Sequence, residues 1–179
     1  MKKILLIGLA LVVLVVGGAT LFVLTYEPAS RPAPDIRVEA TPERVARGDY
    51  IVRNVSVCLH CHSERDWSRF AGPIVEPAGA GGDCWTPEMG FPGTVCAPNL
   101  TPDPETGLGN WTDGEILRAF REGIRRDGTG LTPVMPYDVY RNMSDEDAYS
   151  VVAYLRTLPA VKRKVQAKSV DFPVSFFFK

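Results

Sequence analysis

The sequence predicts an all-α fold, in which a helical domain with long loops is preceded by a single N-terminal transmembrane helix. One long apolar run lies near the start of the chain, and three later segments repeat apolar residues at helical spacing behind N-cap residues. No segment alternates apolar and polar residues as a half-buried strand does. A chain of 179 residues is long enough for one domain with an appendage.

The apolar run, residues 4–24, contains no charged residue. At 1.5 Å of rise per residue, a helix of this length covers about 32 Å, which is enough for the hydrocarbon core of a bilayer. Lys2 and Lys3 precede it, so the positive-inside rule keeps the N-terminus in the cytoplasm and places everything after Tyr26 outside. Residues 1–25 are therefore predicted to be a membrane anchor.

A cleaved signal peptide is the alternative for this segment, with residues 16–19 as a cleavage-like patch. The apolar core of a signal peptide normally has about 7–15 residues, and here the apolar residues 21–24 continue past the patch. A retained anchor is the preferred interpretation. Residues 26–40 contain Pro28, Pro32 and Pro34, and they are predicted to form an extended, semi-stiff spacer.

The folded domain is expected over residues 41–160, with three helices. Thr41 as N-cap and Pro42 at the first helical position begin a helix that should end near Ser56. The other two begin with a capping-box pattern, Thr112 with Glu115 and Ser144 with Asp147, and the last is stopped by Pro159.

The stretch between the first two helices, residues 72–98, is rich in Gly and Pro and is predicted to be loop. Loops longer than roughly 12–15 residues are uncommon in compact folds. The sequence therefore indicates that something other than side chains fills part of the centre.

The chemistry lies in Cys58-Leu59-His60-Cys61-His62, which is the C-x-x-C-H pattern of covalent haem attachment. Two thiols three positions apart on one turn can each add to one vinyl group of a haem, and the adjacent His62 then points its ring at the iron. A thioredoxin-like redox pair would need a βαβ context, and a zinc site would need two further ligands at paired spacing. One covalently attached haem c is the predicted cofactor, with His60 at the surface.

The sixth ligand of the iron cannot be a third histidine, because the chain has only two and both lie in the motif. Met, Lys, Tyr and water remain. Among the methionines Met135 is preferred, since Pro133 and Pro136 stiffen the backbone on both sides. Met143 is expected to pack back on the following helix, and Met89 lies in the glycine-rich loop. A His/Met iron has a raised reduction potential and a closed sixth site, which argues against oxygen chemistry.

Beyond this motif, residues 41–160 resemble a class I cytochrome c. Residues 47–50 are similar to the helix in which a small residue and an aromatic pack on the final helix, and residues 152–156 are similar to that final helix. Residues 99–103, 107–113 and 135–137 are similar to haem modules in cytochrome subunits of membrane-bound bacterial dehydrogenases. In that family the Met of the Met-Pro pair ligates iron, which agrees with Met135. Those subunits hold several haem modules, whereas this chain has one, and the insert that carries Cys84 and Cys96 departs from the family pattern.

Haem attachment and the anchor both place the domain outside the cytoplasm, where thiols oxidise, so Cys84 and Cys96 are expected to form a disulfide. Two unpaired buried thiols are the alternative. The resemblance places the carbonyl acceptor for the ring N–H of the proximal histidine at Gly72-Pro73. Three further residues could reach the haem propionates, although the first of them could equally belong to the core: Trp111, Tyr137 and Asn99.

The leading hypothesis is a membrane-anchored monohaem electron carrier without enzymatic activity of its own. It would lie in the bacterial inner membrane, with the haem domain on the periplasmic side. Its redox partners would be a membrane-bound dehydrogenase or quinol-oxidising complex and a terminal oxidase or other acceptor, and it could be a fixed subunit of a respiratory complex. A haem enzyme or gas sensor with an exchangeable sixth ligand, such as a peroxidase, is the alternative.

Composition and charge restrict the partners further. Charged residues make up 23% of the chain and the net charge is −1, which excludes a disordered chain, a polytopic membrane protein and a strongly basic nucleic-acid binder. Residues 37–158 hold 12 basic and 18 acidic residues, so a docking partner should present positive charge. Residues 161–179 form a basic and then aromatic tail, which is expected either to fray or to contact a partner or the lipid surface.

Overall fold

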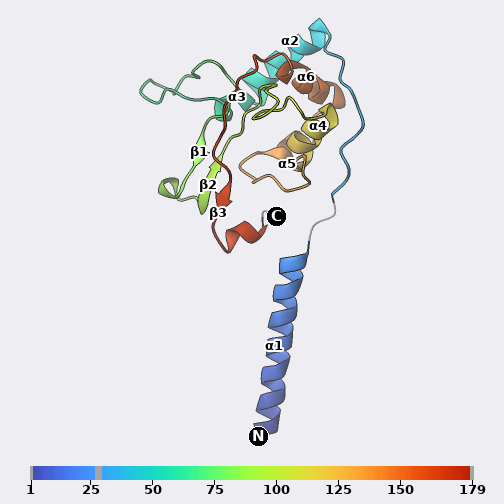
Figure 1. Cartoon of the computed structure of the whole chain (residues 1–179), viewed down its shortest axis with the longest axis vertical. Helices are drawn as coiled ribbons and strands as arrows, with labels where there is room; N and C mark the ends of the chain where they lie inside the picture. The colour runs from blue at the N-terminus through green and yellow to red at the C-terminus, as the bar shows by residue number, and fades with distance from the viewer. Residues whose placement is uncertain (1, 27–29, 178–179) are drawn as a thin grey trace.

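The structure is a computed structural model that describes residues 2–26 and 30–177. In it a long N-terminal helix is followed by a domain of short helices and a small sheet (Figure 1). The helices are α1 (Lys2–Thr25), α2 (Pro42–Tyr50), α3 (Cys58–Cys61), α4 (Asp113–Glu122), α5 (Tyr137–Tyr140) and α6 (Asp145–Leu155). The strands are β1 (Cys84–Trp85), β2 (Gly93–Cys96) and β3 (Ser169–Val170).

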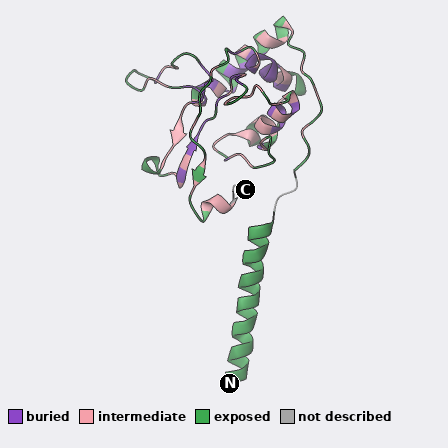
Figure 2. Cartoon of the chain, in the orientation of Figure 1, coloured by how far each residue is buried: buried purple, intermediate pink, exposed green. Residues whose placement is uncertain are grey.

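Helix α1 has 24 residues, and every described side chain on it is exposed (Figure 2). An 18-residue stretch of this helix has a mean hydropathy of 2.8, so the helix is long and apolar enough to cross a membrane. A signal sequence near the N-terminus has the same properties. The prediction of an apolar N-terminal helix is confirmed, and the choice between an anchor and a signal sequence stays a prediction.

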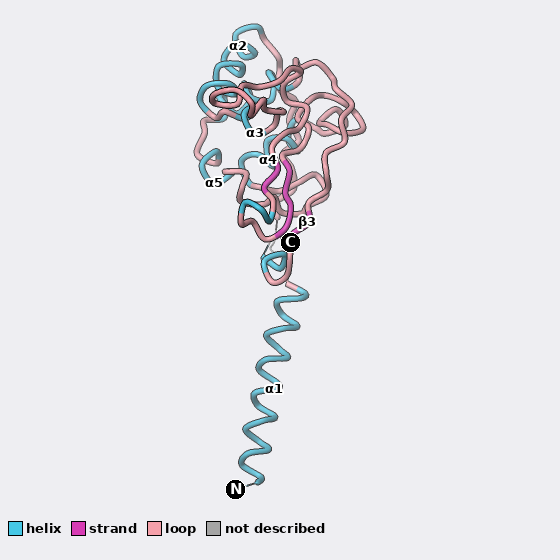
Figure 3. Tube along the Cα trace, turned by 90° about the vertical axis from the view of Figure 1, so that its left-hand side faces the viewer, coloured by secondary structure: helices cyan, strands magenta, loops and turns pink. Residues whose placement is uncertain are grey.

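Helices α2 and α6 pack against each other at the end of the domain far from α1 (Figure 1), and the turned view in Figure 3 shows α2 at the same end. The crossing requires a residue without a side chain, because a Cβ at Gly48 would lie 1.9 Å from the carbonyl oxygen of Ser150 and 2.7 Å from Cβ of Tyr154. The small residue of the predicted helix pair is therefore confirmed. The aromatic residue is not, because Tyr50 is 53% exposed and lies beside the Arg47 guanidinium instead.

The predicted helix starts are confirmed by their caps. The Thr41 hydroxyl accepts the Arg44 N–H, and α2 then continues as a π-helical turn, Ile51–Val55, so that helical structure reaches the expected end near Ser56. Thr112 and Glu115 cap α4 reciprocally. Helix α4 ends at Glu122, and α6 ends at Leu155, before Pro159, the residue that was expected to stop it. Gly123 takes the left-handed conformation at φ 72°, which stops α4 before Ile124.

The proline-rich segment before α2 does not behave as a free spacer over its described part. The side chain of Arg118 in α4 donates to the carbonyl of Arg31 at 3.0 Å, and Asp113 accepts the N–H of Val38 at 2.8 Å. Ile36 and Val38 pack against the core. Residues 31–38 therefore lie along α4. Their backbone groups bond to side chains of α4, and their apolar side chains pack on the core. Pro28 lies outside the described residues.

The prediction that the domain lacks strands is wrong. The three strands form an antiparallel sheet in the order β1-β2-β3, with Cys84 opposite Cys96 and Thr94 opposite Ser169. Two of these strands lie in the stretch 72–98 that the sequence assigns to loop. Strands of two to four residues are too short to show an alternating pattern, and their pairing partners are supplied by a turn and by the distant tail.

The C-terminal tail packs on the domain over much of its length, and the fraying alternative is wrong for these residues. The carbonyl of Val161 accepts the Asn99 side-chain amide at 2.8 Å, the N–H of Arg163 donates to Thr106 at 3.0 Å, and β3 pairs with β2. Phe172 is 81% exposed at the turn beyond β3. The side chains of residues 177–179 lie outside the described part.

Candidate functional site

The C-x-x-C-H residues occupy a separate short helix, α3, and the residue directly after it. Val57 has a positive φ of 44°, which breaks the chain direction between the π-helical turn and α3. His62 follows as C-cap, and its N–H donates to the carbonyl of Cys58 at 3.0 Å. Cys58 and Cys61 are both unpaired in this turn. The two thiols and the imidazole therefore come from five consecutive residues on one rigid turn, and His60 is exposed as predicted.

The His62 ring is held by one hydrogen bond and by burial. Its Nδ1 lies 2.7 Å from the carbonyl oxygen of Pro98, and the residue is 6% exposed. A carbonyl only accepts, so Nδ1 carries the proton and Nε2 keeps a lone pair. Burial lowers the pKa of His62, which favours this neutral form, although the Pro98 carbonyl opposes the shift. A neutral imidazole with a free Nε2 is the form that binds a metal ion.

The predicted acceptor for this ring was wrong. Gly72 uses its carbonyl to accept Nε of Arg65, and the carbonyl of Ala71 accepts the same guanidinium at 2.7 Å. Pro98 is 36 residues away from His62 in sequence, and the sheet brings it beside the ring. Every residue has a backbone carbonyl, so the sequence contains no pattern that predicts this contact of Pro98 with His62.

The electrostatics of the thiols do not favour a reactive dithiol. Burial raises the pKa of Cys58 to about 12, and burial followed by the Asp83 charge raises the pKa of Cys61. Both side chains are therefore protonated at neutral pH, whereas catalytic redox pairs have a lowered pKa. No group of three His, Cys, Asp or Glu side chains capable of holding a metal ion occurs in residues 2–26 and 30–177.

Met135 lies in the turn that leads into α5. Its N–H donates to the carbonyl of Thr132 at 3.0 Å, its carbonyl accepts the N–H of Tyr137 at 2.8 Å, and its side chain is half-buried. The other two candidates lie elsewhere, since Met89 is 67% exposed and Met143 packs against the helical core. Of these three methionines, Met135 is the one that is neither largely exposed nor packed on the helical core, so it remains the candidate ligand.

Helix α5 joins the methionine turn to the cysteine turn through Tyr140, a residue that the sequence analysis missed. The Tyr140 hydroxyl donates to the carbonyl of Ser56 at 2.8 Å. Burial raises the pKa of Tyr140 to about 12, and the charges that Cys58 and Cys61 would carry contribute to this shift. The segment that follows Met135 therefore lies beside the segment that carries the thiols. A tyrosine five residues after Met135 was the available signal.

The three suggested propionate ligands have other partners in this structure. The Asn99 amide is 2% exposed and donates to Thr106 and to the carbonyl of Val161. Trp111 packs against the hydrophobic core. Tyr137 packs its ring against Gly123, where a Cβ would lie 2.7 Å from the ring. The core interpretation of Trp111 is the one that the structure favours.

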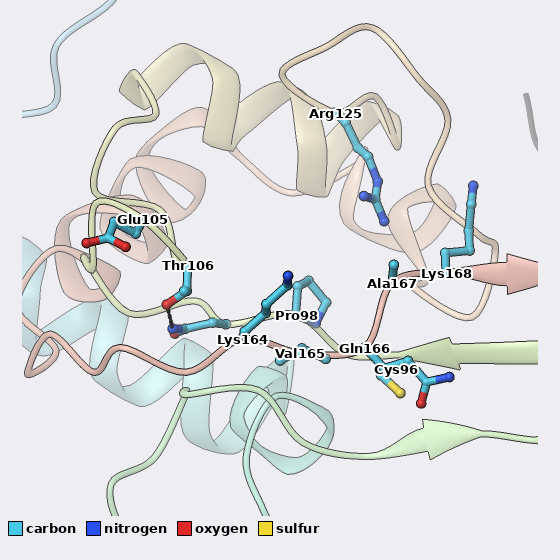
Figure 4. A pocket seen from close by; sticks show the side chains of 11 residues that line it. Cys96, Pro98, Glu105, Thr106, Arg125, Lys164, Val165, Gln166, Ala167 and Lys168 are labelled. Carbon is cyan, nitrogen blue, oxygen red and sulfur yellow. Dashed lines mark hydrogen bonds between the residues drawn. The ribbon is translucent and has the colours of Figure 1, made fainter.

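A cavity of about 450 Å³ is lined in part by Pro98, the residue whose carbonyl contacts His62 (Figure 4). It lies between the loop after β2, the loop after α4 and the tail before β3, and it does not include the motif residues or Met135. Three basic side chains and one acidic side chain line it: Arg125, Lys164, Lys168 and Glu105.

The residues present fit a covalently attached haem. The donor set comprises two unpaired thiols and an imidazole whose Nε2 is free. In addition, two polar atoms on the loop between α4 and α5 are buried without a hydrogen-bond partner among the described residues, Nε of Arg125 and Oγ1 of Thr132. Buried polar atoms normally have partners. Their position on the loop that carries Met135 is consistent with a polar group beside that loop.

Comparison with known proteins finds cytochrome c subunits among the relatives of this chain. The chain is 32% identical over 139 residues to the cytochrome c subunit of a quinone-dependent alcohol dehydrogenase from Gluconobacter oxydans, a match that covers 76% of this chain and 26% of the relative. The chain is a homologue of bacterial cytochrome c subunits. No family model matches it.

Two further relatives of this cytochrome c homologue extend the comparison. Over 81 residues, 45% of this chain and 7% of the relative, it is 44% identical to one of the subunits of a nicotinate dehydrogenase from Pseudomonas putida. It is 31% identical over 176 residues to a dihaem cytochrome c-type protein from Cereibacter sphaeroides, covering 97% of this chain and 54% of the relative. The chain thus spans from less than a tenth to about half of the length of these relatives, and its homology supports haem c and electron transfer.

Proposed function

We propose that the protein is a membrane-anchored monohaem c-type cytochrome that transfers single electrons. The observation that carries this proposal is the arrangement on α3, where two unpaired thiols lie on the same turn as an imidazole with a free Nε2. The chain has one C-x-x-C-H motif, which supports a single haem. The dihaem relative is about twice as long as the matched segment, which leaves room there for a second motif.

An attached haem supplies one-electron exchange at its iron. The residues of this chain would hold it and set its surroundings: Cys58 and Cys61 would form the thioether links, while His62 and Met135 would be the protein ligands of the iron. The Pro98 carbonyl fixes the tautomer and orientation of the imidazole. Burial of the ring shields it from water, and the hydrogen bond from Tyr140 to Ser56 holds α5 beside the segment that leads into the cysteine turn. If both residues bind the iron, no bond-making activity is expected of this chain.

The anchor and the partners belong to the same proposal. Helix α1 is apolar over residues 4–24 and exposed, which supports a single membrane span, and Lys2 and Lys3 before the apolar run favour a domain in the periplasm. Relatives that are subunits of dehydrogenases support a dehydrogenase as electron donor. A quinol-oxidising complex is the other donor, and a terminal oxidase or another acceptor would take the electron onward. The acidic domain would dock on a positively charged surface.

The optical spectrum of the purified full chain tests the function. We expect a covalent haem that remains attached under denaturing conditions, and a weak long-wavelength Met-to-iron band in the oxidised protein that disappears in Met135→Ala. Met143→Ala is the matched control, because this methionine packs on the core and should leave the band unchanged. Ready binding of carbon monoxide to the reduced wild type would overturn the carrier proposal in favour of a haem enzyme or gas sensor.

A further inference from the structure

The Pro98 carbonyl that orients His62 is held by a backbone ladder. Both backbone groups of Ala97 are hydrogen-bonded to the neighbouring segment. Its N–H donates to the carbonyl of Asp83 at 2.9 Å, and its carbonyl accepts the N–H of Gly82 at 3.2 Å. Pro98 follows directly. The position of its carbonyl therefore depends on how firmly segment 82–84 is held.

Segment 82–84 is fixed on its other side to the haem-binding turn itself. The N–H of Gly81 donates to the carbonyl of His62 at 2.9 Å, and the N–H of Asp83 donates to the carbonyl of Cys61 at 3.0 Å. The two backbones nearly touch, since a Cβ at Gly82 would lie 1.9 Å from the carbonyl oxygen of Ser63. Three backbone segments thus lie side by side and are joined by hydrogen bonds: residues 61–63, 81–84 and 96–98.

The Cys84–Cys96 disulfide closes this arrangement at the end away from His62. It joins directly opposed residues of β1 and β2, separated by 12 in sequence. Cys96 lies two residues before Pro98 and Cys84 one residue after Asp83. Beyond the bridge, the connecting segment 86–92 contains exposed residues and a short 3₁₀ turn, Pro87–Met89, but no packed helix. The hairpin by itself is a short pairing of two residues per strand, which is weak in water.

We infer that the Cys84–Cys96 disulfide is a positioning device for the axial histidine, because it locks the Pro98 carbonyl against Nδ1 of His62 through the ladder of residues 81–84. Cys84 and Cys96 are then positioning residues, distinct from the ligands. This inference rests on the proposed function, since His62 is an axial ligand only if haem is attached.

The expected effect has a defined sign. A hydrogen bond from Nδ1 to a carbonyl makes the imidazole a stronger electron donor, which stabilises the ferric iron. Without the disulfide, the carbonyl and the ring separate more often. The Nδ1 proton of reduced, diamagnetic protein should then exchange with solvent about tenfold faster, because local opening becomes easier. The reduction potential should rise.

The test uses full-length holoprotein in two disulfide-free forms. One is the double variant Cys84→Ser/Cys96→Ser. The other is wild type whose disulfide is opened by a phosphine reductant and alkylated, which leaves the haem thioethers intact and does not depend on folding of the variant. Both forms are compared with Ile116→Val, a core change on α4 that has no bond to the ladder and lowers global stability.

The inference is supported if both disulfide-free forms show faster Nδ1 exchange and a higher potential than Ile116→Val. It is overturned if haem is attached but both quantities match those of Ile116→Val, because the disulfide then contributes only to global stability. The mass of the denatured protein is measured first. A mass without porphyrin would reject the proposed function instead, so the two failures are distinguishable.

Discussion

The helical half of the domain and the loop half are stabilised in different ways. In α2, α4, α6 and the π-helical turn, the buried side chains are mostly apolar, such as Ile51, Leu117 and Val152. In residues 63–112 the buried side chains are small or polar: Ser63, Ala78, Ala80, Val95, Cys96, Ala97, Asn99, Thr101 and Asp103. The first half is held by apolar burial, whereas the second depends on directed hydrogen bonds, one disulfide and the packing of a few apolar side chains against the core of the first half. A half without its own apolar core needs something else to fold around.

The largest expected effect comes from removing the haem links. Cys58→Ala/Cys61→Ala should abolish covalent haem completely, as measured by mass under denaturing conditions. We also expect the amides of residues 63–112 to lose protection from hydrogen exchange, because that half has little apolar core of its own.

His60→Ala is the matched control, since this exposed residue lies between the two cysteines and should leave the haem in place. Full protection of residues 63–112 without haem would break the comparison, because the loop half would then be stable by itself.

The next effect tests the helical half. Gly48→Ala places a methyl group where the Ser150 carbonyl lies, so α2 and α6 must separate. Forced overpacking of this kind should lower the free energy of unfolding by about 3 kcal/mol. Denaturant unfolding measures it, with Glu43→Gln, exposed on α2, expected to change the same quantity by less than about 0.5 kcal/mol. Equal stability of the two variants would show that the crossing can yield.

A smaller effect is expected from the polar centre of the loop half. Asn99→Ala removes the acceptor of two Thr101 bonds and the donor to Thr106 and Val161. Because these buried groups are then unpaired, the free energy of unfolding should fall by about 2 kcal/mol. The amide of Val161 should exchange faster as the tail detaches.

Asn110→Ala is the control for this change, because its single bond to the Pro104 carbonyl is exposed. An Asn99→Ala protein with an undisturbed tail would mean that the other tail contacts, among them β3 and the hydrogen bond from Arg163 to Thr106, hold the tail without Asn99.

The smallest expected effect is a difference between the two halves in how salt changes the pKa of a carboxylate. Hydrogen bonds from Thr106 hold the pKa of Asp103 below the ordinary 3.8, whereas Arg47 holds the pKa of Asp147 below it. Both depressed carboxylates stabilise the fold above about pH 3.8, and this contribution is lost as the pH falls through their folded pKa values. Salt at about 1 M screens charges beyond about 3 Å. In an NMR titration it should therefore raise the pKa of Asp147 more than that of Asp103; equal shifts would contradict the assignment.

What the sequence could predict follows the same division. Helix caps at Thr41, Thr112 and Ser144 are local patterns, and the C-x-x-C-H motif is local as well, so both were readable. The sheet, the Pro98 acceptor and the contact of Tyr140 with Ser56 each join residues far apart in sequence through backbone carbonyls or very short strands. Such contacts leave no periodic signal. The ligand role of Met135 stays a prediction.

The attachment of residues 31–38 to α4 also limits how far the haem domain could travel. If α1 spans a bilayer, the chain leaves it near Tyr26 and is held again at the Arg31 carbonyl by Arg118, with four residues between. Five backbone steps of at most about 3.6 Å reach about 18 Å. A domain on so short a tether could not diffuse away from the bilayer, so electron donors and acceptors would have to meet it at the membrane surface.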